Sequence, residues 1–178
     1  MKNSKNLKIH LATLCNCNPK AISNLINDVY ALEEAPVWKV GHLRTTEDFI
    51  QKSIQKEEII VAEISGELAG IVHTKQLDST LGWFGMLVVP VSLRGNGIAS
   101  SLYNASEKRM LELGCAKMQC EVLIPEESVI PMKQTLQNWY ARLGYQLDSS
   151  CPMTDLYPLA KNTLKMACDL EIYLKNLK

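Results

Sequence analysis

Short segments of alternating hydrophobic and polar residues recur along the chain, and this period of two is typical of β-strands. Two of these segments flank the turn residues Ser65 and Gly66, which predicts a β-hairpin. The segments differ in length but all lie between turn or helix signals. The predicted strands are 8–14, 58–64, 67–76, 81–89, 117–124, one that starts at 145–147, and 167–173.

Between these strands, hydrophobic residues recur every three to four positions, which predicts helices at 19–31, 45–56 and 97–113, one ending at Gly144, and a short one around 154–160. Asn18 before Pro19 is a typical N-cap followed by a first helical residue. Thr45 with Asp48 resembles a capping box. The expected apolar stripes comprise Ile98, Leu102, Ala105 and Leu113 in the long helix, and Leu136, Trp139, Tyr140 and Leu143 in the helix before Gly144.

The length of 178 residues predicts a single domain spanning 1–178. Lysine plus arginine equal aspartate plus glutamate at 19 each, so no general attraction to nucleic acid or membrane is expected. No apolar run reaches the roughly 20 residues of a membrane helix, and the polar N-terminus lacks a signal-peptide core. We therefore expect a cytoplasmic protein with free cysteines. No metal is expected, because Cys15-x-Cys17 lacks a second pair at zinc spacing.

The segment from Leu87 to Ala99 joins an apolar strand to the long helix through a loop with two glycines, Gly95 and Gly97. Glycine permits close approach of a ligand to the backbone, and a helix start offers unpaired N–H groups. Together they predict a phosphate site. The loop lacks the Lys-Ser/Thr of a P-loop, and Ser100 replaces the third glycine of a dinucleotide fingerprint. The preceding hairpin also disfavours a dinucleotide-dependent oxidoreductase.

The remaining pattern, Arg94-x-x-Gly97-x-Ala99, resembles the acyl-CoA signature Gln/Arg-x-x-Gly-x-Gly/Ala of the GNAT superfamily of N-acetyltransferases. The segment 139–145, about 45 residues further on, resembles the aromatic-Tyr-x-x-x-Gly-aromatic segment of many members. The chain departs from the family in two ways. Pro90 lies four residues before Arg94 instead of three, and the strand at 81–89 lacks the general-base glutamate of many members.

This resemblance covers roughly residues 7 to 175. It implies the α+β acyl-CoA N-acyltransferase fold, with α/β/α layers and a mixed, mostly antiparallel seven-stranded sheet. The sheet would be splayed between its fourth and fifth strands and flanked by about four helices. Acetyl-CoA would be the acyl donor, its pantetheine arm pairing with the backbone of Leu87, Val88 and Val89. Its pyrophosphate would bind main-chain amides at Arg94, Gly95, Asn96, Gly97, Ile98, Ala99 and Ser100.

Tyr140 is the candidate general acid, because a phenol within hydrogen-bond reach can protonate the departing thiolate. Its place on the apolar stripe is also typical of a core aromatic residue. Glu121 is the first candidate for the general base, since burial in an apolar strand would raise the pKa of its carboxyl. His73 is a second candidate, and a water chain serves as base in many members.

The acceptor site in this fold is shaped by the loops at 32–44 and 125–131, which contain Glu33, Glu34, Glu126 and Glu127. Acidic residues at its mouth would favour a cationic amine. The predicted function is acetyl transfer from acetyl-CoA to a primary amine by direct attack in a ternary complex, because no cysteine near the loop or Tyr140 offers a nucleophile. The alternative is a non-catalytic acyl-CoA-binding regulatory module. The acceptor's identity, and the choice between monomer and homodimer, stay open.

Overall fold

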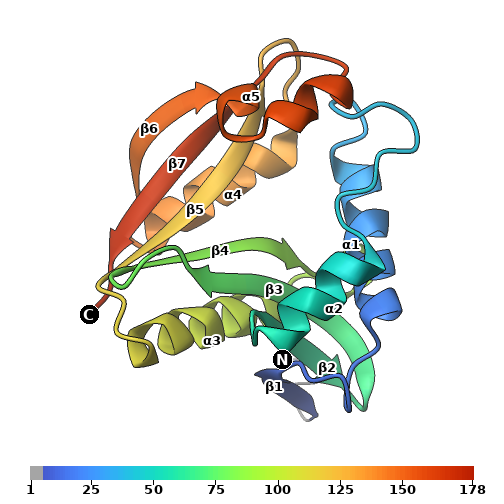
Figure 1. Ribbon diagram of the computed structural model, residues 1–178, viewed down its shortest axis with the longest axis vertical. Helices are drawn as coiled ribbons and strands as arrows, with labels where there is room; N and C mark the ends of the chain where they lie inside the picture. Colours follow the sequence, from blue (N-terminus) through green and yellow to red (C-terminus); the bar gives the residue numbers. More distant parts are fainter. Residues whose placement is uncertain (1–5) are drawn as a thin grey trace.

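The computed structural model describes residues 6–178, which form one seven-stranded sheet with helices on both faces (Figure 1). The strand order is β1-β2-β3-β4-β5-β7-β6, and only the β4–β5 pair is parallel. The predicted mixed, mostly antiparallel sheet is therefore confirmed. The strands are β1 (Leu7–Leu11), β2 (Ile59–Ile64), β3 (Glu67–Gln76), β4 (Leu81–Val88), β5 (Lys117–Pro125), β6 (Gln146–Pro152) and β7 (Cys168–Asn176).

Alternation along β2 explains the layers of helices. Ile60 and Ala62 belong to the core beneath α3, whereas Ile59 and Val61 belong to the core beneath α1 and α2. Successive strand residues point to opposite faces, so one strand contributes to both layers. The helices are α1 (Pro19–Glu33), α2 (Glu47–Gln55), α3 (Ile98–Glu112), α4 (Pro131–Arg142) and α5 (Met153–Leu156), with 3₁₀ turns η1 (Val91–Leu93) and η2 (Pro158–Asn162).

The caps of the first two helices test the sequence signals. Asn18 caps α1, its Oδ1 accepting from the amide of Lys20 at 2.9 Å. The cap of α2 is Thr46, not the predicted Thr45, and its Oγ1 accepts from the amide of Phe49 at 3.2 Å. Thr45 is buried, and both its backbone groups bind the side chain of Asn27 at 3.0 Å. This tertiary pairing decides which of the two adjacent threonines is the cap.

The buried face of α3 also differs from the prediction. It comprises Ile98, Leu102, Tyr103, Ser106 and Met110. Leu113 is 44% exposed, because α3 ends at Glu112 and the chain turns at Gly114. Arg109 lies outside the buried face, and its Nη2 pairs with Glu57 Oε2 at 2.9 Å.

The central feature of the sheet is the divergence of β4 from β5 (Figure 1). The two strands pair only where Leu81–Trp83 face Lys117–Gln119. Within the described chain, the edge of β4 from Phe84 to Val88 therefore has no strand partner on its β5 side. This confirms the predicted splay between the fourth and fifth strands.

A bulge adds to this opening. Ile71 pairs with Val88 and His73 with Gly85, so three steps along β4 oppose two along β3. Met86 takes up the extra residue with a φ of +44°, which is unusual for a side-chained residue. The bulge forms although Pro90 lies one residue further from Arg94 than is common in the family pattern. Bulges often redirect side chains next to functional sites.

Candidate functional site

A groove of about 380 Å³ lies between the end of β4, the glycine loop and α4. We call it the loop groove. Asn96 is the one predicted cofactor residue that does not line it, because its Nδ2 donates back to the carbonyl oxygens of Leu93 at 3.0 Å and Arg94 at 3.3 Å. The predicted residues that do line it are Leu87, Val88, Val89, Arg94, Gly95, Gly97, Ile98, Ala99 and Ser100.

The two glycines of this loop have positive φ angles, +76° at Gly95 and +77° at Gly97. A Cβ at either position would meet nothing within 4 Å, so the loop surface is open. Gly97 is the N-cap of α3 and offers no side-chain acceptor to the first-turn amides. Such amides, at the positive end of the helix dipole, form a site for an anion.

The Arg94 side chain ties the loop to its neighbours. Its guanidinium forms an ion pair with Glu33 of α1, and its Nε donates to the carbonyl of Val89 at 3.3 Å. The Arg94 amide is also occupied, because it donates to the carbonyl of Val91 at 3.3 Å. The main-chain amides from Gly95 onward are therefore the groups of this loop that can meet an anion.

A second cavity, of about 80 Å³, lies in the opening between β4 and β5, and we call it the splay cavity. Trp83, Gly85 and Met86 of β4 line one wall, and Glu121 and Leu123 of β5 line the other. The two cavities meet along a common border that β4, α1 and α4 form. The shared lining residues are Tyr30, Glu34, Leu87, Lys133 and Leu136.

Tyr140 of α4 lines the splay cavity and is only 5% exposed. Its ring packs against Phe84 and Tyr145, with centroids 5.7 and 5.8 Å away. Burial raises the pKa of its hydroxyl well above the usual value, so the phenol keeps its proton at neutral pH. The residue therefore belongs to the aromatic core and also borders the cavity.

Glu121 also lines the splay cavity, but its surroundings are not the apolar ones that we expected. Its Oε1 accepts from Trp83 Nε1 at 3.3 Å and from Gln119 Nε2 at 3.2 Å. Its Oε2 accepts from Tyr157 Oη at 3.0 Å. These donors come from β4, β5 and the segment after α5, so they fix the carboxylate between the walls. The strand pattern alone carries no signal for them.

Trp83 reaches Glu121 because Gly85 has no side chain. A Cβ at Gly85 would lie 2.4 Å from the indole ring of Trp83. Two residues on the same face of a strand would ordinarily compete for that space.

His73 lies away from both cavities. It is 3% exposed, and its Nε2 is 3.2 Å from Glu58 Oε2. Burial lowers the pKa of the imidazole, although Glu58 acts in the opposite direction. Its ring packs edge-on against Phe49 and Trp83. His73 is not among the described residues that line the loop groove or the splay cavity. Its position therefore does not support a role as the general base.

The expected acidic mouth is not formed, because the glutamates of the 32–44 loop are paired. Glu33 binds Arg94, and the buried Glu34 forms an ion pair with Lys133. Trp38 Nε1 also donates to Glu34 Oε2 at 2.7 Å. Burial raises the pKa of the Glu34 carboxyl, but Lys133, Arg44 and these hydrogen bonds together lower it below its usual value. Among residues 6–178, neither Glu126 nor Glu127 lines the two cavities.

The described residues contain no cluster of three or more histidine, cysteine, aspartate or glutamate side chains able to hold a metal. All six cysteines are free thiols. No helix within residues 6–178 is long and apolar enough to cross a bilayer.

The Glu34–Lys133 pair should contribute substantially to stability. In Lys133→Met the carboxylate is left buried without its cation, a change that costs about 3–5 kcal/mol and lowers the unfolding midpoint by roughly 2–4 °C per kcal/mol. Because the folded-state pKa of Glu34 is depressed, the pair's contribution is fully present above the ordinary carboxyl pKa and is lost as pH falls through the lower folded-state pKa. Thermal unfolding of wild type and variant from pH 7 down to below that folded-state pKa should show their midpoints converging.

Lys108→Met is the matched control, since Lys108 pairs with Glu112 on the exposed surface of α3. It should cost no more than about 0.5 kcal/mol. Glu34→Gln combined with Lys133→Met should recover part of the loss. A Lys133→Met midpoint equal to that of the control would contradict this account of the pair.

Comparison with solved structures identifies the same architecture elsewhere. An aminoglycoside 6′-N-acetyltransferase complexed with coenzyme A matches with a TM-score of 0.70 at 16% identity, over 96% of this chain and 97% of that one. A GNAT family acetyltransferase from Elizabethkingia anophelis with acetyl-CoA bound matches with a TM-score of 0.66 at 13% identity. That match covers 98% of this chain and 100% of the other. The N-acetylglutamate synthase from Neisseria gonorrhoeae, complexed with coenzyme A and N-acetyl-glutamate, matches with a TM-score of 0.68 at 18% identity. This match covers 99% of the present chain and 36% of the synthase chain.

At these identities the structures show a common fold and no more. The sequence adds a match of residues 21–145 to the family described as Acetyltransferase (GNAT) family. That range includes the glycine loop, both strands of the splay and Tyr140. The chain therefore belongs to the GNAT acetyltransferase family.

Proposed function

We propose that the protein is an N-acetyltransferase that transfers the acetyl group of acetyl-CoA to a primary amine by direct attack in a ternary complex. The observation that carries this proposal is the meeting of two cavities beside the unpaired edge of β4. The loop groove suits the acyl donor, and the splay cavity suits the acceptor. Leu87, which lines both, marks the place where the thioester would lie.

Three features of the loop groove support acetyl-CoA as its ligand. The open amides at Gly95 and Gly97 suit the pyrophosphate. The free edge of β4 from Phe84 to Val88 offers main-chain groups to the pantetheine amides, in the manner of an added strand. Fold neighbours contain coenzyme A or acetyl-CoA.

The chemistry follows from the groups on either side of this edge. The amine nitrogen attacks the thioester carbonyl carbon, the C–N bond forms, and the C–S bond breaks. Unpaired main-chain N–H groups along β4 would stabilise the developing oxyanion. Glu121 would accept the proton that the amine loses, and Tyr140 would give its proton to the departing thiolate. Glu121 also places on β5 a carboxylate that β4 lacks, which favours catalysis over a purely binding role.

Binding of the donor can be measured without an acceptor. Acetyl-CoA at about 100 times its dissociation constant should stabilise the fold by roughly 2.7 kcal/mol, a midpoint rise of about 2–4 °C per kcal/mol. NADH and ATP should produce no such rise. Gly97→Asp, which places a charge and a strained side chain at the N-cap of α3, should abolish the acetyl-CoA shift.

Gly66→Asp is the matched control, because Gly66 also has a positive φ, +87°, and an open surrounding, but lies in the β2–β3 turn. It should lower the basal midpoint while leaving the acetyl-CoA shift intact. An unchanged shift in Gly97→Asp would remove the glycine loop from the donor site, and a shift with NADH alone would point to a different ligand.

Tyr140→Phe tests the general acid. It removes only the hydroxyl from a packed ring, so the midpoint and the acetyl-CoA shift should be retained. Loss of general acid–base catalysis typically lowers turnover by about 10²–10⁴-fold. Thiol release would be followed with an amine acceptor from pH 6 to pH 10, and unchanged turnover at every pH would rule out the acid role.

A further inference from the structure

Four charged side chains line the splay cavity: Glu34, Arg44, Glu121 and Lys133. Glu34 and Lys133 form an ion pair with each other. Arg44 makes no direct ion pair with a carboxylate in the described chain, although its charge also acts on Glu34 and helps to lower the pKa of that carboxyl. Glu121 is held only by uncharged donors. Among the described residues, Arg44 and Glu121 are therefore the cation and the anion of this cavity that lack a direct charged partner.

Arg44 is held in place by its neighbours. It lies at the end of the α1–α2 loop, and its guanidinium carbon is 5.0 Å from the ring centroid of Tyr30. The next residue, Thr45, is fixed to Asn27 by two hydrogen bonds. An arginine is charged at any accessible pH and carries five N–H donors in a rigid fork that matches a carboxylate.

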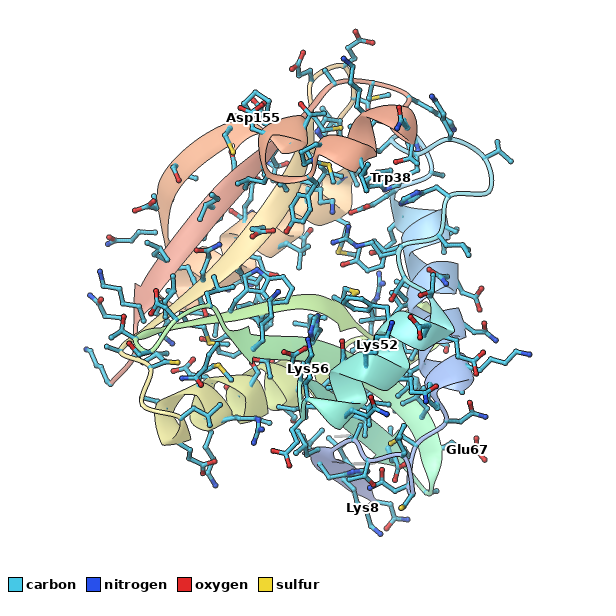
Figure 2. All side chains as sticks on the ribbon, viewed as in Figure 1. Lys8, Trp38, Lys52, Lys56, Glu67 and Asp155 are labelled. Atoms are coloured by element: carbon cyan, nitrogen blue, oxygen red, sulfur yellow. The ribbon has the colours of Figure 1, made fainter. Side chains whose placement is uncertain are left out.

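The α1–α2 loop, which contains Arg44, is also fixed to the segment that follows α5. Trp38 forms an isolated bridge with Leu164, and the amide of Lys39 donates to the carbonyl of Thr163 at 2.8 Å. Figure 2 shows Trp38 where this loop meets the segment after α5, above the end of α1. The Arg44 side chain is exposed at the cavity, but the loop that carries it is tethered on both sides of this residue.

Glu121 has capacity for one more partner. A carboxylate has about four acceptor positions, and Trp83, Gln119 and Tyr157 occupy three of them. Tyr157 also lies within the electrostatic influence of Arg44: burial and Glu121 raise the pKa of its hydroxyl to about 12, and Arg44 acts against them. Tyr157 therefore donates a hydrogen bond to Glu121 and also lies close enough to Arg44 to be influenced by its charge.

The size and walls of the cavity limit what can enter. A buried water needs about 10–15 Å³ of cavity volume. The splay cavity of 80 Å³ therefore holds roughly five to eight water-sized groups. That is the size of a small amino acid and is too small for a sugar ring system. The uncharged walls include the apolar side chains of Met86, Leu123, Met153 and Leu170.

We propose that the acceptor is a free α-amino acid with an apolar side chain, its carboxylate bound by Arg44 and its amine directed to Glu121. This inference rests on the proposed acetyl transfer and specifies its substrate class. Arg44 would act in binding and orientation, and Glu121 would bind the ammonium before accepting its proton. The product would be the N-acetylated amino acid, with coenzyme A released as the thiol.

The test compares each amino acid with the amine that lacks only its carboxylate. Alanine would be paired with ethylamine, and valine with 2-methylpropylamine, and thiol release would be followed with acetyl-CoA. Wild type should prefer both amino acids. Arg44→Gln should lower kcat/KM for the amino acids by about 10- to 100-fold, the loss expected for a charge-assisted contact, and leave the amines unaffected. Arg44→Lys should lose less.

Arg142→Gln is the matched control, because Arg142 is exposed at the end of α4 and lines neither cavity within residues 6–178. It should change neither substrate class. The acetyl-CoA shift of each variant confirms that the donor site is intact. An equal loss on amino acids and amines in Arg44→Gln, or wild-type rates that are the same for both, would overturn the inference while leaving acetyl transfer in place.

Binding separates this inference from the proposed function. N-acetylvaline titrated calorimetrically into the coenzyme A-bound protein should bind wild type at least ten times more tightly than Arg44→Gln. Such a difference without thiol release from any acceptor would support the carboxylate site and overturn acetyl transfer. Equal binding of N-acetylvaline to wild type and variant would overturn the carboxylate site.

Discussion

The site depends on one constraint, which is that β4 and β5 pair over only three residues each before they separate. Parallel strands without continued pairing leave main-chain donors and acceptors exposed along their facing edges. Here the freed edge of β4 runs from Phe84 to Val88 and separates the loop groove from the splay cavity. A fully paired sheet would fill this space, and the two cavities could not meet.

The surrounding side chains keep the opening from collapsing. Lys133 of α4 pairs with Glu34 at the end of α1, which joins two helices from opposite sides of the gap. Trp83 and Tyr157 both donate to Glu121, which joins β4 and the segment after α5 to β5. A site held by such contacts is preorganised, so binding energy need not be used to build it.

Local signals in the sequence predicted what depends on local geometry. Alternation located the strands, although it marked only the start of β6, which continues to Pro152. Asn18-Pro19 marked the start of α1, and the spacing of Gly95 and Gly97 located the open loop. Thr45 and Thr46 both satisfy the local rule for a helix N-cap. The hydrogen bonds between Thr45 and Asn27, which is 18 residues away in the sequence, decide that Thr46 is the cap.

The charges of the site could not be predicted in the same way. Glu33 and Glu34 are adjacent acids in the sequence, but their partners are Arg94 and Lys133, the latter 99 residues away. These pairings remove the acidic mouth that composition indicated. They also leave Arg44, which no motif distinguishes, as the splay-cavity cation without a direct ion-pair partner among the described residues.

Amide hydrogen exchange with and without acetyl-CoA tests the central claim most directly. If the donor lies along the freed edge of β4 with its pyrophosphate on the glycine loop, exchange should slow at 84–88 and 95–100. The β1–β2 pair, on the far side of the sheet, should be unchanged. If acetyl-CoA bound measurably but amide exchange at both segments stayed unchanged, that result would contradict the account.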